Sequence, residues 1–239
     1  MKKLLIGLSI ATLTNMSLAS ERTGFYLKGN VGANKMNEAR EKNSTEGISI
    51  NSNKSEADIS PAFNIGVGGY INDFIRHDLT FGYSKINFKE SAVNFNVFDR
   101  IEDLSYIGQS VVKRKSSIYS LIFNSYIDIP ITDNSKIFIG GGIGLAQIKE
   151  TLSQTWSVNA FEENTFIGSH IENNSYKTKD KFNLAYSLTL GTSIKISTKA
   201  NIELAYSWAA FGKANHNTKG ITSNEYNGHS VMTGIRFDL

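Results

Sequence analysis

Seven charged residues of this 239-residue sequence lie in segments that alternate between apolar and small polar residues. They occupy otherwise small, polar positions close to short turns: Lys28, Asp78, Asp128, Lys195, Glu203, Arg236 and Asp238. Spacing about the turn at 197–200 predicts that Lys195 and Glu203 lie across a hairpin. Arg236 and Asp238 are expected to face Lys28. Because charges enclosed in a narrow interior persist when paired, we interpret the set as a structural ion-pair network; a gated pore or a catalytic carboxylate pair is the alternative.

The other residues with potential chemistry do not assemble into a recognisable active site. The glycines at 140, 142 and 144 are not followed by a helix start or by the Lys-Ser/Thr pair that a phosphate-binding loop requires. His229 precedes Ser230, but neighbours in a strand point to opposite faces, so they cannot form one site. The four histidines show no paired spacing for a metal ion. The sequence therefore predicts no enzyme, no metal and no cofactor.

The N-terminus has the three parts of a secretory signal peptide. Lys2 and Lys3 precede an apolar stretch, and Ser17 and Ala19 have the small-x-small spacing of a cleavage site. We expect a signal peptide at residues 1–19 and one barrel domain at 20–239. Removal of the signal peptide, with Lys2 and Lys3, lowers the formal charge from +3 to +1. This charge does not favour nucleic acid as a partner. The sequence has no cysteine, so export does not imply a disulfide framework.

Apolar and polar residues alternate with a period of two, the pattern of β-strands. Eight segments show it: 24–34, 60–71, 78–84, 116–129, 136–146, 181–196, 201–209 and 229–239. Most approach the length of about 9–11 residues that a tilted strand needs to cross a membrane. An even number of strands lets the last strand pair with the first.

The polar face of these segments decides between a soluble and a membrane barrel. It consists mainly of Gly, Ser, Asn, Thr and Ala, which suit the cramped lumen of an eight-stranded barrel better than a surface in water. The apolar face carries aromatic residues typical of lipid–water boundaries: Tyr83, Tyr119, Tyr186, Tyr206 and Trp208. We therefore predict an all-β fold, an eight-stranded antiparallel transmembrane up-and-down β-barrel.

Long and short connections alternate along the chain. The long ones lie at 37–59, 89–115, 150–180 and 213–227, and the short ones contain Asp, Asn or Pro. Outer-membrane barrels have short periplasmic turns and long extracellular loops. The sequence predicts a barrel in the cell outer membrane, with extracellular loops and periplasmic termini.

The long connections contain the candidate binding residues, which are aromatic or basic: Phe95, Phe98, Lys113, Arg114, Lys115, Trp156, Phe161, Lys177 and Lys179. Aromatic side chains in an exposed loop either pack on something or bind something. The basic clusters are suited to acidic lipopolysaccharide head groups or acidic host glycans, although a solvated rim is an equal alternative. The aromatic stretches are equally compatible with strands that continue above the membrane as hairpins.

The last residues resemble an assembly signal. Gly234, Phe237 and Leu239 have the spacing of the C-terminal signal that the outer-membrane barrel-assembly machinery reads. Met232 stands where that signal usually has a polar residue, and the final residue is Leu rather than an aromatic one. We expect the same strand to close the barrel against the first.

Four stretches in this order carry a family resemblance: "FYLKGNVGANKMN", "NIGVGGYINDFIRHDLTFGYSK", "NSYIDI" and "IFIGGGIGLA". They resemble the small outer-membrane barrel adhesins of rickettsias and, more broadly, OmpA/OmpX-like surface barrels. The resemblance implies a surface adhesin or antigen whose loops contact host serum or cell-surface proteins such as vitronectin. It also implies that outer-membrane lipid and lipopolysaccharide surround the barrel. A structural barrel without a specific ligand and a small porin-like channel stay open as alternatives.

Overall fold

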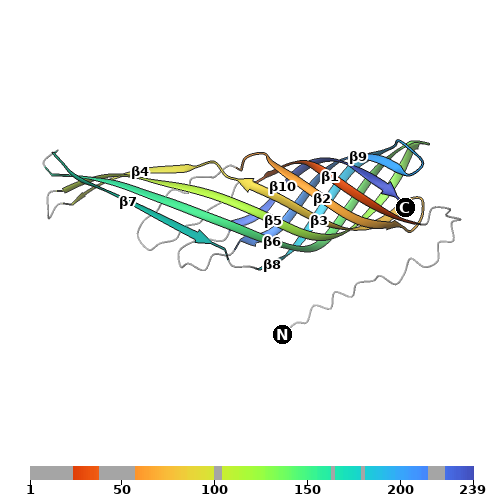
Figure 1. Cartoon of the computed structure of the whole chain (residues 1–239), viewed down its shortest axis with the longest axis horizontal. Coiled ribbons are helices and arrows are strands. Elements are labelled where there is room, and N and C mark those ends of the chain that lie inside the picture. Colours follow the sequence, from red (N-terminus) through yellow and green to blue (C-terminus); the bar gives the residue numbers. More distant parts are fainter. Residues whose placement is uncertain (1–23, 38–56, 100–103, 163–164, 179–180, 215–223) are drawn as a thin grey trace, which may run out of the picture.

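The computed structural model describes residues 24–37, 57–99, 104–162, 165–178, 181–214 and 224–239. Regular structure in these ranges is β-strand (Figure 1). Among the described residues, no helix has the length and hydrophobicity needed to cross a membrane. The expected signal peptide, residues 1–19, lies outside the described residues.

Eight strands form a closed ring in which neighbouring strands are antiparallel. They are β1 (Gly24–Met36), β2 (Ser60–Tyr70), β3 (Ile75–Asn87), β5 (Leu104–Thr132), β6 (Ser135–Glu162), β8 (Phe182–Lys195), β9 (Ala200–Ala214) and β10 (Asn224–Asp238). The order around the ring is β5-β3-β2-β1-β10-β9-β8-β6, and the β5–β6 pairing completes it. The predicted eight-stranded up-and-down barrel is confirmed.

The last strand closes the barrel against the first. β1 and β10 pair along their length, with Leu27 opposite Phe237. The amide of Leu239 donates a hydrogen bond to the carbonyl oxygen of Phe25 at 3.0 Å. The sequence ends in an apolar strand because its backbone groups pair with β1 while its apolar side chains face outward. This confirms the expected seam.

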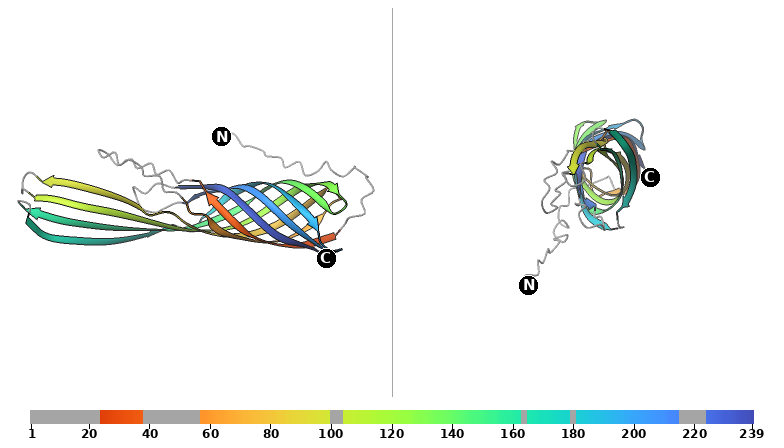
Figure 2. Two further views of the ribbon diagram at one scale, coloured as in Figure 1. Left: turned by 90° about the horizontal axis from the view of Figure 1, so that it is seen from above. Right: turned by 90° about the vertical axis from the view of Figure 1, so that its left-hand side faces the viewer.

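Three short turns lie at one end of the barrel, near the C-terminus (Figures 1 and 2). We call it the turn end, and the opposite end the loop end. The Asn72 side-chain oxygen accepts hydrogen bonds from the amides of Phe74 and Ile75 at 2.9 and 2.7 Å. Ser197 Oγ accepts one from the amide of Ala200 at 3.0 Å. These local bonds satisfy backbone groups where the chain reverses.

Two strands extend far beyond the barrel. β5 has 29 residues and β6 has 28, and their distal parts pair with each other. β4 (Ser91–Asp99) pairs with β5, and β7 (Thr165–Lys177) pairs with β6. The resulting four-stranded sheet, which we call the extension, projects from the loop end (Figure 2). The expected long loops at 89–115 and 150–180 are therefore largely strand, and the hairpin alternative is confirmed.

The barrel wall outside the lumen is apolar. Ile65, Ile143 and Leu188 are 65, 58 and 63% exposed, in a belt that all eight barrel strands share. Such a belt is unfavourable in water and favourable in hydrocarbon. A closed ring also satisfies the backbone polar groups, as a membrane interior requires. The belt and the ring together make this a transmembrane barrel.

The belt ends at a group of aromatic side chains near the loop end, which we call the girdle: Tyr83, Tyr119, Tyr186 and Trp208. The rings of Tyr83 and Tyr119 are 5.1 Å apart, and those of Tyr186 and Trp208 are 5.7 Å apart. Tyrosine and tryptophan are enriched at lipid–water interfaces, where one part of the side chain is apolar and another is wet. The girdle therefore marks the level at which the belt meets water.

Candidate functional site

Six buried charged side chains fill the lumen near the turn end: Lys28, Arg76, Asp78, Asp128, Glu203 and Arg236. We call them the charged plug. Lys28 Nζ lies 2.6 Å from Asp78 Oδ2, and Arg76 Nε lies 2.9 Å from Asp128 Oδ1. Glu203 Oε1 contacts two cations: it lies 3.3 Å from Arg76 Nη2 and 2.5 Å from Arg236 Nη1. The three cations and three anions leave the plug with no net charge.

Aromatic rings and neutral donors surround these charges. The Arg76 guanidinium lies 4.2 Å from the ring centre of Tyr126 and 4.8 Å from that of Phe138. Thr80 and Asn124 donate hydrogen bonds to Asp78 at 2.8 and 2.9 Å. A cation over an aromatic face is stabilised further when it is removed from water. The arrangement is a cross-linked cluster of charged and aromatic side chains across the lumen.

The register tests the pairings expected from sequence. Arg236 lies opposite Lys28, as predicted, but Asp238 lies opposite Tyr26. Asp238 is at the rim, where it accepts a hydrogen bond from Tyr70 at 2.6 Å and lies 3.9 Å from Arg236. The expected pairing of Lys195 with Glu203 is wrong.

Lys195 is exposed at the turn end and lies opposite Asn201, whereas Glu203 lies opposite Ser193. The reversal places Ile196 and Ala200 in the turn, with a hydrogen bond from the amide of Ile196 to the Ala200 carbonyl at 2.9 Å. This shifts the symmetry centre of the hairpin by one residue. Lys195 consequently has no place in the charged plug.

Sequence reasoning missed Arg76, which contacts two carboxylates in the plug. The segment predicted from the alternation begins at Asp78, which leaves Arg76 outside the expected strand. β3 in fact begins at Ile75, and Arg76 has the inward position two residues before Asp78. Extending the period of two backward would have placed both side chains in the lumen.

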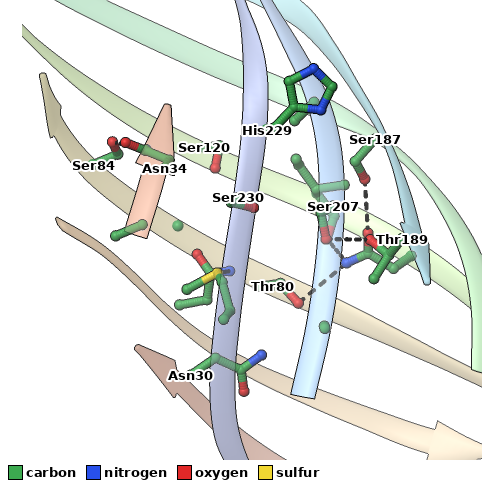
Figure 3. A pocket seen from close by; sticks show the side chains of 18 of the residues that line it. Asn30, Asn34, Thr80, Ser84, Ser120, Ser187, Thr189, Ser207, His229 and Ser230 are labelled. Atoms are coloured by element: carbon green, nitrogen blue, oxygen red, sulfur yellow. Dashed lines mark hydrogen bonds between the residues drawn. The ribbon is translucent and has the colours of Figure 1, made fainter. Parts of the chain in front are cut away.

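Small polar side chains surround a cavity of about 120 Å³ in the middle of the lumen. Figure 3 shows part of its lining: Asn30, Asn34, Thr80, Ser84, Ser120, Ser187, Thr189, Ser207 and Ser230. Asn34 donates a hydrogen bond to Ser84, and Thr189 and Ser207 are joined at 2.8 Å. The volume accommodates several water molecules, but the charged plug separates it from the turn end.

A second plug closes the lumen toward the loop end. Its apolar residues include Met36, Ile86, Phe88, Ile118, Ile122, Ile148 and Tyr226, with Phe211 packed against them. A β-bulge opposite Tyr226 and Asn227 leaves Phe211 as the extra residue. Gly212, with φ of 84°, supplies the left-handed backbone conformation that follows it. These apolar side chains pack against one another inside the barrel between the cavity and the loop end.

Arg114 belongs to this second plug and not to an exposed loop. It is 4% exposed, and its Nε lies 3.3 Å from Glu150 Oε1. Tyr226 donates a hydrogen bond to Glu150, and its hydroxyl lies 2.5 Å from Ser116 Oγ. Expecting Arg114 among exposed binding residues was therefore wrong. Its even position in β5, two residues before buried Ser116, was the available signal.

The extension has one aromatic face, continuous with the lumen wall. Phe95 on β4 and Trp156 on β6 have ring centres 5.7 Å apart, and Tyr106 on β5 shares their side of the sheet. The opposite side of β6 carries hydroxyl and amide groups, among them Thr155 and Asn159. On β6 the apolar side chains thus face outward in the barrel and inward in the extension, where the polar outer side of the strand suits contact with water.

The remaining candidate residues have different placements. Phe161 contacts Phe166 at 5.8 Å near the tip of the extension. Lys113, Lys115 and Lys177 point outward and are exposed. Lys179 and the side chain of Phe98 lie outside the described part of the chain.

The histidines lie apart from the lumen charges. The His77 ring packs on Phe123 at 5.5 Å, on the outer wall, while neighbouring Asp78 points inward. His229 is exposed and lies 2.6 Å from the Tyr206 hydroxyl, on the opposite side of its strand from Ser230. Within the described ranges no group of three or more acidic or histidine side chains could hold a metal ion.

The three residues of the expected assembly signal lie on β10 and at its end. Phe237 and Leu239 are exposed on the outer wall, at 45 and 64%. Gly234 faces the lumen opposite Asn30, where a larger side chain would collide with the β1 backbone. Recognition of this strand by the assembly machinery stays a prediction.

The chain is similar in sequence to proteins of several Rickettsia species. A putative adhesin of Rickettsia conorii is 32% identical over 97% of this chain and 89% of its own. A putative adhesin of Rickettsia bellii is 33% identical over 100% and 99%. No protein-family model matches the chain.

Among solved structures, Neisserial surface protein A has a TM-score of 0.48 and 14% identity, covering 90% of this chain and 97% of its own. OprG, an outer membrane protein of Pseudomonas aeruginosa, has a TM-score of 0.47 and 14% identity, covering 92 and 98%. The full-length match to the rickettsial proteins carries the assignment, and the ring of strands independently defines the barrel. The chain therefore belongs to the rickettsial family of outer-membrane β-barrels named as putative adhesins.

Proposed function

We propose that the protein is a surface adhesin that binds host proteins through its extension. In this proposal the loop end faces the exterior, and the turn end and both ends of the barrel chain face the periplasm. The names of the rickettsial relatives support the adhesin role. The outer-membrane location follows from the exposed apolar belt and the family.

One observation carries the proposal: β5 and β6 continue unbroken from the membrane barrel into a four-stranded sheet. Continuous strands transmit the rigidity of the barrel to the extension, so binding there needs little ordering of the backbone. Its aromatic face presents Phe95, Tyr106 and Trp156, which can bury large areas at low entropic cost. These features favour a binding surface over an inert shield.

Shortening the extension is expected to abolish adhesion while leaving the barrel intact. Residues 90–112 and 154–174 would each be replaced by Asn-Gly, which favours a tight hairpin turn. This keeps the buried residues Phe88, Arg114 and Glu150 in place. Beads coated with wild-type or shortened protein would be counted on cultured animal cells and on immobilised vitronectin. The different gel mobility of unheated and boiled samples would confirm folding in each case.

A pair of variants tests which face of the extension binds. Phe95→Ser with Trp156→Ser removes the contacting aromatic pair of the inner face. Ile107→Ser with Ile171→Ser changes two exposed apolar residues of the outer face. The first pair should reduce bead attachment strongly and the second should have little effect. Full attachment of the folded, shortened protein would contradict the proposal and leave the structural barrel as the better explanation.

The filled lumen supports a protein without channel or enzyme activity. The charged plug and the second plug interrupt the path at two levels. We propose that the polar cavity between them has a structural role, since eight strands leave room for side chains and few waters. Sustained conductance of the protein in planar bilayers would exclude this role.

A further inference from the structure

Outward-facing lysines gather on one side of the barrel where the apolar belt ends. We call them the lysine patch: Lys85, Lys113, Lys115, Lys149 and Lys177. They come from β3, β5, β6 and β7, and each is exposed. The extension's aromatic face lies on the other side of the same sheet, so the patch is a separate surface.

The first row of the patch is centred on Ser117. The register places this residue opposite both Lys85 on β3 and Lys149 on β6. Lysines two strands apart are about 10 Å from each other at the backbone. The Lys149 ammonium lies 5.7 Å from the ring centre of Tyr119, a residue of the girdle. This row therefore lies at the level where hydrocarbon gives way to water.

The second row is one step further from the belt. Thr151 lies opposite both Lys115 on β5 and Lys177 on β7. Each row thus has one cation on each side of a residue that bears a hydroxyl group. Ammonium and hydroxyl donors at this spacing suit an anion with several oxygen acceptors.

The charge of the patch is strongly one-sided. Lys113 pairs with Glu90 at 2.8 Å. The outward positions in the described parts of β3, β5, β6 and β7 carry no Asp or Glu. At the turn end, in contrast, three lysines, Lys136, Lys195 and Lys199, are matched in number by Asp73, Asp133 and Asp238. The turn end therefore has no comparable excess of exposed lysines.

We propose that the lysine patch binds the phosphate groups of anionic lipids in the membrane leaflet at the loop end. Its position beside the girdle places the ammonium groups at head-group level. Binding of a soluble polyanion would not require the lysines to lie at the level of the lipid head groups. Each lysine near an anionic leaflet contributes about 1 kcal/mol of attraction, or roughly a fivefold change in affinity. The inference goes beyond adhesion, because it concerns how the barrel is held and oriented in its membrane.

The test compares two double variants of equal charge change. Lys115→Gln with Lys177→Gln removes the second row. Lys35→Gln with Lys213→Gln removes two exposed lysines from the loop-end parts of β1 and β9, outside the patch. Each protein, folded in maltoside micelles, would be titrated with bisphosphorylated lipid A and with its dephosphorylated form, and bound lipid counted by native mass spectrometry. Inorganic phosphate and heparin would be added as competitors.

Wild-type protein should retain the phosphorylated lipid and not the dephosphorylated one. Loss of the second row should weaken retention by about tenfold or more, whereas the control pair should not change it. Equal retention of both lipids, or equal losses in both variants, would overturn the proposal. Displacement by heparin with no lipid retention would assign the patch to sulfated glycans instead.

A matched experiment separates this inference from the adhesin proposal. The shortened protein that lacks residues 90–112 and 154–174 keeps all five lysines of the patch. It should retain phosphorylated lipid fully while its beads fail to attach to cells. Should the second-row variant fail to fold, Lys177→Gln alone provides the measurement, because this exposed residue lies on β7, outside the barrel ring.

Discussion

Replacing Arg76 by methionine is expected to lower the free energy of unfolding by about 3–5 kcal/mol. Arg76 neutralises Asp128 at 2.9 Å and shares Glu203 with Arg236. Methionine fills much of the space but leaves Asp128 with an uncompensated buried charge. Urea unfolding of the protein in detergent micelles or lipid vesicles, followed by tryptophan fluorescence and gel mobility, would measure the change.

Two control variants separate the loss of charge pairing from a general effect of mutation. Asp238→Asn alters a carboxylate at the rim, 3.9 Å from Arg236, and should cost less than about 1 kcal/mol. Arg76→Met combined with Asp128→Asn removes a charge of each sign and should recover part of the loss. Equal stability of wild type and Arg76→Met would mean that the plug is not a stabilising network.

Much of the barrel was predictable because lipid imposes a strict period of two. Leu27 and Phe237 had to face outward, which also fixed the opposite faces of β1 and β10. That constraint predicted Lys28 opposite Arg236, which the register confirms. A one-residue slip would turn every apolar side chain of the strand into the lumen.

The extension was harder to predict because the apolar face changes sides along continuous strands. On β6, Ile143 points outward in the barrel, but Trp156 points to the inner side of the sheet. A search for apolar residues facing outward therefore stops near Leu145. The segments beyond it resemble polar loops, although their own alternation continues.

Details near the turns depended on single residues rather than on patterns. Lys195 appeared symmetric with Glu203 only if the 197–200 turn was centred between them. The actual hydrogen bond from Ile196 to Ala200 pairs Lys195 with Asn201. Hydrophobic periodicity constrains the face of a strand strongly, but the exact turn depends on local hydrogen bonds such as those to Ser197.

Placing an arginine in the middle of the belt is expected to cost about 2–4 kcal/mol in lipid vesicles. Leu190 is 53% exposed on the outer wall of β8, between Ile139 on one neighbour and Tyr206 on the other. Leu190→Arg would place a guanidinium in hydrocarbon, with only partial relief from bending toward the interface. Folding into vesicles from urea, monitored by gel mobility, measures the loss.

Ser169→Arg is the matched control, because it adds the same group at an exposed outward position on the extension. If the belt lies in lipid and the extension in water, the control should differ from wild type by less than about 1 kcal/mol. The comparison depends on the solvent around each side chain, since both variants keep the strand pairing. A soluble barrel would tolerate arginine at Leu190 as readily as at Ser169, because both positions would then face water. A similar cost at the two sites, or none at Leu190, would therefore contradict the transmembrane assignment.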